Sequence, residues 1–125
     1  MQSHVGFSLI EVLISLIILS ILLLGFDAMQ MVTLREAKAA YYFSVATEQL
    51  NSMLARLEAF HGRNDADQLA EWNKQNQDVL PQGRGIMHGI YPDFVLDIFW
   101  GDLHVSECNE NKIGQSGCLR QIVKL

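Results

Sequence analysis

A continuous apolar stretch dominates the start of the chain, from Phe7 to Phe26. Glu11 is the only ionisable side chain within it. A helix that crosses the hydrocarbon core of a bilayer needs about 20 apolar residues, so the pattern predicts a transmembrane helix over residues 7–26. A carboxylate inside such a helix is costly unless it is paired or neutralised, which makes Glu11 a candidate functional residue.

The helical pattern continues beyond this stretch. Six apolar residues recur at alternating steps of three and four, which is typical of a stripe along one face of a helix: Phe43, Ala46, Leu50, Met53, Leu57 and Phe60. No proline precedes Pro81, so we expect one helix from about Phe7 to about Phe60, with residues 27–61 as its amphipathic continuation. Such a stripe favours a domain core over an exposed binding face, and it predicts a sheet packed on the helix.

Residues 62–125 have the pattern of a small globular part. We expect Gly62 to cap the long helix, and Asp65 or Asp67 to cap a short helix through residues 68–72 that runs out before Pro81. Four segments rich in Ile, Val, Phe and Leu then predict strands: 85–90, 94–100, 103–108 and 119–125. Antiparallel hairpins, with a tight turn at residues 100–102, would join them. The predicted fold class is α+β: a long N-terminal helix packed on a small antiparallel sheet of three to four strands.

Composition and charge set limits on function. The chain has 125 residues, half of them hydrophobic, which allows one small domain and a membrane segment. Its formal net charge is −5, and its nine Lys and Arg residues are spread from Arg35 to Lys124 without a run. A nucleic-acid surface needs clustered positive charge, so we expect no nucleic-acid partner. No residue pattern indicates a cofactor, and none is expected. Asp65 and Asp67 suggest calcium, but an EF-hand loop needs Gly at its sixth position, where this chain has Ala70, so helix capping is favoured and no metal is expected.

A specific resemblance is carried by the segment Gly6-Phe7-Ser8-Leu9-Ile10-Glu11-Val12-Leu13-Ile14. It resembles the class III signal of type IV pilins and type II secretion pseudopilins. The resemblance implies that a prepilin peptidase at the inner membrane cuts between Gly6 and Phe7, that residues 1–6 are a leader that is removed, and that the new terminal Phe7 is N-methylated. A secretory signal peptide would instead be cut after its apolar core, so the apolar helix is expected to remain as an anchor.

The resemblance also implies a role for Glu11, which would meet the terminal amine of a neighbouring subunit as a fibre grows. Cleavage after Gly6 would create that positive amine four residues before Glu11, about one helical turn away in the same chain. Removing one member of a desolvated ion pair costs on the order of 3–5 kcal/mol, so we expect the pair to fix the register between subunits. The leader contains His4 but no Lys or Arg, so a cytoplasmic amino terminus is implied by the resemblance and not by charge.

Cys108 and Cys118 bracket a mostly polar segment. A disulfide would order it, a periplasmic location would favour oxidation, and many pilins end in a disulfide-bounded loop, so we expect these two residues to be bonded. A metal site is the alternative, although no further Cys or His stands at a usual ligand spacing. An enzyme would need His104 as base and Cys108 as nucleophile, which in a strand lie about 13 Å apart. We therefore expect no catalytic residues and no enzyme.

Three further segments narrow the resemblance to minor subunits of type IV pili. They are residues 18–26 with Ala28-Met29-Gln30, Trp72 with Leu80-Pro81-Gln82-Gly83-Arg84-Gly85, and the hydrophobic strand that ends at Trp100 with Asp102 close behind. Many major pilins also have a proline just beyond the apolar stretch, which this chain lacks. The resemblance therefore implies a minor pilin.

A minor pilin of this kind has a structural function. It is anchored in the inner membrane by a single pass with its globular part in the periplasm, primes or promotes pilus assembly there, and enters the fibre at or near the tip, supporting adhesion or twitching motility. The implied partners are the prepilin peptidase, other minor pilins, the major pilin, the inner-membrane assembly platform and, before assembly, membrane lipid. Two alternatives stay open: a minor pseudopilin of a type II secretion system, and an adhesin that binds through the loop between Cys108 and Cys118.

Overall fold

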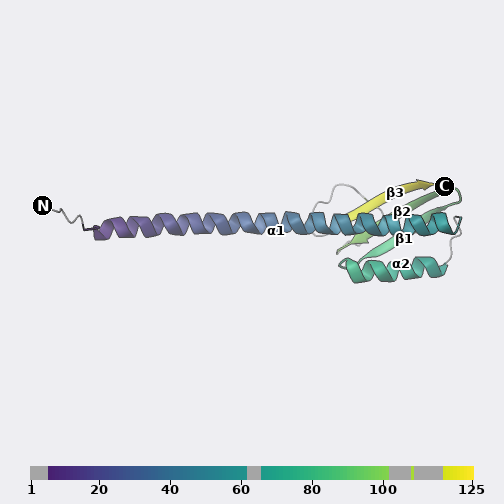
Figure 1. The fold of residues 1–125 in the computed structure, drawn as a ribbon, viewed down its shortest axis with the longest axis horizontal. Helices are drawn as coiled ribbons and strands as arrows, with labels where there is room; N and C mark the ends of the chain where they lie inside the picture. Colours follow the sequence, from purple (N-terminus) through teal and green to yellow (C-terminus); the bar gives the residue numbers. More distant parts are fainter. Residues whose placement is uncertain (1–5, 62–65, 102–107, 109–116) are drawn as a thin grey trace. The chain divides into compact units, whose positions relative to one another are not determined.

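The computed structural model describes residues 6–61, 66–101, 108 and 117–125. These residues form two helices and three strands, in the order α1 (Leu9–Ala59), α2 (Ala66–Val79), β1 (Arg84–Ile90), β2 (Asp93–Trp100) and β3 (Gly117–Lys124) (Figure 1). The chain divides into two compact units, Met1–Leu34 and Arg35–Leu125, and α1 contributes residues to both. The predicted α+β class, with a long helix packed on a small antiparallel sheet, is confirmed.

The long helix begins and ends within two residues of its predicted bounds. At its start, the carbonyl oxygen of Ser8 accepts hydrogen bonds from the N–H groups of Glu11 and Val12, at 2.9 and 3.3 Å. At its end, the residue with a left-handed backbone is His61, whose φ is 53°. The predicted cap, Gly62, lies outside the described residues.

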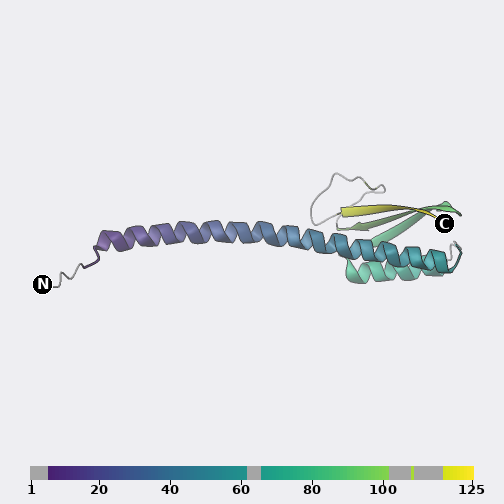
Figure 2. The ribbon, with the colours of Figure 1, turned by 45° about the horizontal axis from the view of Figure 1, so that its top comes forward.

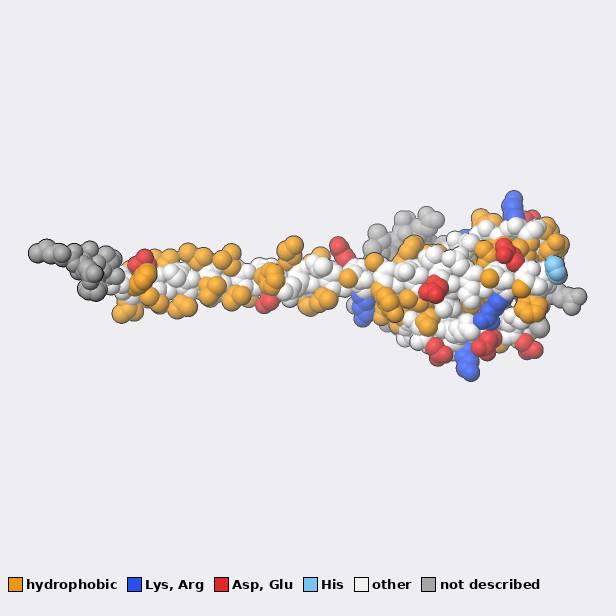
Figure 3. Space-filling model, in the orientation of Figure 1, with side chains coloured by type: hydrophobic (Ala, Val, Ile, Leu, Met, Phe, Trp, Pro, Cys, Tyr) orange, Lys and Arg blue, Asp and Glu red, His pale blue; other side chains and the backbone are white. Residues whose placement is uncertain are grey.

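The described residues of the N-terminal unit form no core of their own. Every described residue from Gly6 to Leu34 is exposed, and hydrophobic side chains dominate the face of this unit that is visible in Figure 3. In the described part of the chain, α1 is the helix that is long and apolar enough to cross a membrane. Burial for these side chains must therefore come from lipid or from another protein, because folding of this unit provides none.

The second unit has two layers. The three strands form an antiparallel sheet in the order β1-β2-β3, and both α2 and the C-terminal part of α1 lie on one side of it (Figure 2). Both sides of β2 are occupied, by β1 and by β3. The tight turn expected at residues 100–102 therefore does not join two neighbouring strands. Residues 102–107, which include most of the predicted strand 103–108, lie outside the described residues.

The core lies between the helices and the sheet. Its buried side chains come from α1, α2, the turn after α2, and β2 and β3: Ala46, Leu50, Met53, Leu57, Trp72, Leu80, Phe94, Leu96, Ile98, Trp100 and Val123. The predicted apolar stripe of α1 is thus confirmed from Ala46 to Leu57. Its two predicted ends, Phe43 and Phe60, are not buried in the core. Phe43 and Phe60 are 54% and 49% exposed, because the sheet and α2 cover only the central part of the stripe.

The predicted second helix is confirmed, and it ends before Pro81 as expected. It extends to Val79, and Asp67 lies inside its first turn instead of capping it, while Asp65 lies outside the described residues. Two hydrogen bonds join α2 to α1: Trp72 Nε1 donates to the Gln49 carbonyl oxygen at 2.9 Å, and Arg56 Nη2 donates to Gln75 Oε1 at 3.0 Å. These contacts fix α2 beside the buried part of α1.

Candidate processing and assembly site

Gly6 and Phe7 lie in the short segment that precedes α1. Neither residue is part of a helix or a strand, and both are exposed. No atom lies within 4 Å of the place that a Cβ at Gly6 would take, and Phe7 is 82% exposed. The peptide bond between these two residues is therefore exposed and not helical in the structure.

Glu11 lies in the first turn of α1, next to this bond. Its backbone N–H is bonded to the carbonyl oxygen of Ser8, and its side chain makes no ion pair with any described residue. A negative charge in the first turn interacts favourably with the partial positive charge of the helix N-terminus. The spacing Ser8-x-x-Glu11 is also that of a capping box, a local signal that the sequence analysis missed.

The apolar surface around Glu11 is unusually large for a monomer. Side chains on all faces of the helix between Leu9 and Leu24 are 48–81% exposed. Exposed apolar surface of this extent marks a contact with lipid or with another protein. Glu11 is therefore a single carboxylate at the edge of a surface that must be covered, which is the setting in which an unpaired charge is costly.

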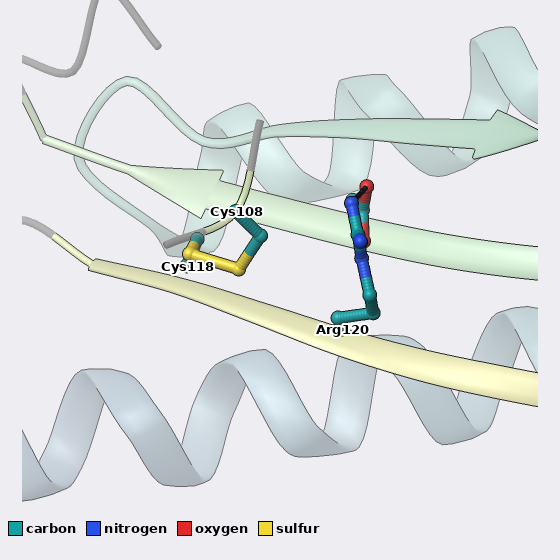
Figure 4. Close-up of polar contacts among 4 residues, drawn as sticks. Cys108, Cys118 and Arg120 are labelled. Carbon is teal, nitrogen blue, oxygen red and sulfur yellow. Dashed lines mark hydrogen bonds and ion pairs between the residues drawn. A yellow bond between two sulfur atoms is a disulfide. The ribbon is translucent and has the colours of Figure 1, made fainter. Parts of the chain in front are cut away.

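The second predicted site, the cysteine pair, is a disulfide in the structure. Cys108 and Cys118 are bonded, with their Cα atoms 5.5 Å apart, and Cys118 lies in β3 directly opposite Phe99 of β2 (Figure 4). Both sulfur atoms are used by this bond, so neither a metal site nor a free Cys108 nucleophile is available. His104 and residues 109–116 lie outside the described residues.

An ion pair close to the disulfide was not found from the sequence. Asp97 on β2 and Arg120 on β3 are register partners, and the guanidinium donates two hydrogen bonds to the carboxylate, at 2.7 and 2.9 Å (Figure 4). The Asp97 side chain is fully buried. Arg84 of β1 lies over the ring of Phe99, with its Cζ atom 5.3 Å from the ring centroid. This face of the sheet is held by polar contacts, whereas the opposite face carries the hydrophobic core.

The residues on this face do not form a catalytic or metal-binding arrangement. Across the described parts of the chain, no group of three or more His, Cys, Asp or Glu side chains is placed to hold a metal ion. The Asp97 carboxylate accepts two hydrogen bonds from Arg120 and is buried away from solvent. The contacts that the structure shows for Asp97 and Arg120 hold β2 to β3.

Comparison with protein-family models gives a match in the N-terminal segment. Residues 6–26 match the family model described as the prokaryotic N-terminal methylation motif. No curated protein and no solved structure matches the chain. The motif is the class III signal of type IV pilin-like proteins, and it indicates a type IV pilin or pseudopilin.

This signal has direct consequences. It implies processing by a prepilin peptidase, and together with the apolar helix that follows, it indicates anchoring in the inner membrane before assembly. Proteins that carry it are generally structural subunits and not enzymes. The matched segment contains Gly6, Phe7 and Glu11, the residues predicted for processing and assembly.

Proposed function

We propose that this chain is a minor type IV pilus subunit that primes or promotes pilus assembly at the inner membrane and is incorporated at or near the fibre tip. The observation that carries the proposal is the continuity of α1. The methylation motif at residues 6–26 leads without a break into the part of the helix that packs on the sheet. An anchor and a small head on one continuous helix suit a subunit that is first held in a membrane and then moved into a fibre.

In this proposal the precursor is processed at the bond between Gly6 and Phe7. Residues 1–6 are the leader, residues 7–26 cross the membrane and later line the fibre core, residues 27–61 continue the helix, and residues 62–125 complete the head in the periplasm. Phe7 becomes the N-methylated terminus. The exposure of both residues and the absence of helix at this bond support cleavage there.

Glu11 is the proposed assembly residue. After cleavage, the helix begins with a positive amine, and Glu11 is the nearest carboxylate. Within the described residues it has no cation of its own, while the surface around it must be covered. Pairing with the amine of a neighbouring subunit satisfies both charges at the moment when water and lipid headgroups are excluded.

A minor subunit is favoured over a major one by the narrower resemblance to the minor pilin PilV. The residues that carry this resemblance in the head are structural ones: Trp72, Leu80 and Trp100 are all buried in the core. They build the α2–sheet packing and do not form an exposed binding surface. The resemblance therefore concerns the architecture of the head, and it supports a shared place in the assembly more than a shared ligand.

Deletion of the gene distinguishes a subunit of a type IV pilus from a pseudopilin of a type II secretion system. We expect loss or strong reduction of surface pili and of twitching motility, with normal secretion of extracellular proteins. The reverse result, normal pili with blocked secretion, would assign the chain to a type II secretion system as a pseudopilin. If pilus number stays normal and only attachment is lost, the chain acts as an adhesin.

Processing is tested by the mass of the N-terminal peptide of the membrane-bound protein. We expect a peptide that begins at Phe7 and carries one additional methyl group. Gly6→Ala should leave a precursor of unchanged mass in the membrane. Normal processing of this variant would show that the cut lies elsewhere.

A further inference from the structure

Asp27 is a second carboxylate within the exposed apolar surface of α1. Phe26, Met29, Val32 and Leu34 on both sides of it are 57–70% exposed, and the first basic residue beyond it is Arg35. The apolar surface therefore continues past the end of the proposed membrane segment at Phe26. When this surface is covered by another molecule, Asp27 is covered with it.

The described residues of the N-terminal unit offer Asp27 no positive partner. The described residues contain no ion pair or hydrogen bond to its carboxylate. The residues one turn away on either side of it are Leu23, Leu24, Gln30 and Met31, none of which carries a charge. Arg35 is eight positions further on, which is about 12 Å along a helix. A cation that pairs with Asp27 must come from another molecule.

The charged groups of the N-terminal helix indicate which cation pairs with Asp27. If the chain is processed as proposed above, on which this inference rests, the segment from Phe7 to Leu34 carries one positive group, its terminal ammonium, and two negative groups, Glu11 and Asp27. Each neighbour that begins with the same motif brings one such ammonium on an apolar helix, so Glu11 and Asp27 meet the ammonium groups of two different neighbours. We propose that Asp27 binds the terminal ammonium group of a neighbouring pilin-type helix that is shifted along the fibre axis by about 30 Å, the rise of the 20 residues from Phe7 to Asp27.

The required shift makes this contact specific for the assembled fibre. The hydrocarbon core of a bilayer is also about 30 Å thick, so before assembly Asp27 lies at one boundary of the membrane and the ammonium at the other. Two helices side by side in the membrane cannot bring these groups together. The pair forms only when one helix has been moved by the full membrane thickness relative to the next, so it stabilises fibre and not membrane oligomers.

A simpler role for Asp27 is to mark the membrane boundary, for which a polar side chain is sufficient. Asp27→Asn keeps the size and polarity but removes the charge, and Asp27→Glu keeps the charge. The matched control is Glu36→Gln, which removes an exposed acid from the same helix beyond the apolar surface. The readout is the ratio of this chain in sheared fibres to processed chain in the membrane.

We expect Asp27→Asn to lower this ratio roughly tenfold or more, as for loss of one member of a desolvated pair, while Asp27→Glu and Glu36→Gln stay near the wild-type value. An unchanged ratio for Asp27→Asn, with wild-type chain present in the fibre, overturns the inference and leaves the proposed function standing. Absence of the wild-type chain from the fibre overturns both.

A photo-crosslinking side chain in place of Met31 identifies the neighbour directly. Met31 lies one turn from Asp27 on the same face and is 57% exposed. In fibres, we expect the crosslinked peptide to come from the first turns of a mature pilin-type helix and to carry its methylated terminal residue. Crosslinks that reach only a globular head, or only the part of a neighbouring helix that carries Arg35 and Lys38, would refute the proposed pairing.

Discussion

The indole ring of Trp72 occupies the space directly above Gly85, where any side chain would have to lie. This contact joins α2 to β1 across the core face of the sheet. Two hydrogen bonds involve the same two residues. Trp72 Nε1 donates to the Gln49 carbonyl oxygen, and the Gly85 N–H donates to Asn73 Oδ1 at 2.6 Å. One glycine therefore sets how closely α2 approaches the sheet.

Gly85→Ala should destabilise the head, because the added Cβ would overlap the ring of Trp72. Overpacking of this kind costs about 1–3 kcal/mol in the free energy of unfolding. The measurement is chemical denaturation of the full chain in detergent, followed by tryptophan fluorescence. Gly25→Ala is the matched control, since nothing lies within 4 Å of its added Cβ and a helix interior favours Ala by up to about 1 kcal/mol. Equal stability of Gly85→Ala and wild type would contradict the packing described here.

The Asp97–Arg120 pair leads to a second prediction. Arg120→Ala removes both hydrogen bonds from a fully buried carboxylate, and an uncompensated buried charge costs about 3–5 kcal/mol. Unfolding of the variant should therefore occur at a clearly lower denaturant concentration. Lys124→Ala, an exposed residue on the same face of β3, should change stability by about 0.5 kcal/mol or less.

The double variant Asp97→Val with Arg120→Val distinguishes charge from packing. Replacing a buried ion pair by apolar residues is often close to neutral, because the desolvation cost disappears together with the attraction. We expect the double variant to be more stable than Arg120→Ala. If it is equally unstable, the arginine acts through its packing and not through the Asp97 charge.

The disulfide is expected to contribute to the stability of the head. Cys108 and Cys118 are ten positions apart, and closing a loop of this size stabilises a protein by about 2–3 kcal/mol. Replacing both cysteines by serine should lower the unfolding free energy by that amount. A reducing agent should have the same effect on the wild type and none on the double variant; a variant that still responds to the reductant would point to a different cause.

The sequence predicted the elements of this fold well because their signals are local. The apolar stretch, the stripe from Ala46 to Leu57 and the hydrophobic strands can each be recognised within a short window. The signal at Gly6 to Glu11 is equally local, and the family model matched the same segment.

The remaining features depend on register and on the extent of the sheet, which no short window contains. Asp97 and Arg120 are 23 positions apart and meet only because β2 pairs with β3 across the intervening segment. Phe43 and Phe60 follow the helical period, yet the layer that covers the stripe stops short of both. The contact between Gly85 and the ring of Trp72 could not be predicted, because it depends on how α2 lies on the sheet.

Glu11→Gln tests the proposed assembly residue with a minimal change, and Glu11→Val tests it with an apolar one. Both variants should be cut, methylated and inserted, because the bond between Gly6 and Phe7 stays exposed. Both should nevertheless enter fibres poorly, since the ammonium of the neighbour would be covered without a negative partner. Quantitative blots of fibre and membrane fractions measure this.

Glu11→Asp distinguishes an effect of the charge on the helix N-terminus from its pairing with a neighbouring subunit. The shorter acid preserves the effect on the helix N-terminus, whereas it should weaken the pairing across subunits. Normal pilus number and incorporation in Glu11→Val would rule the pairing out.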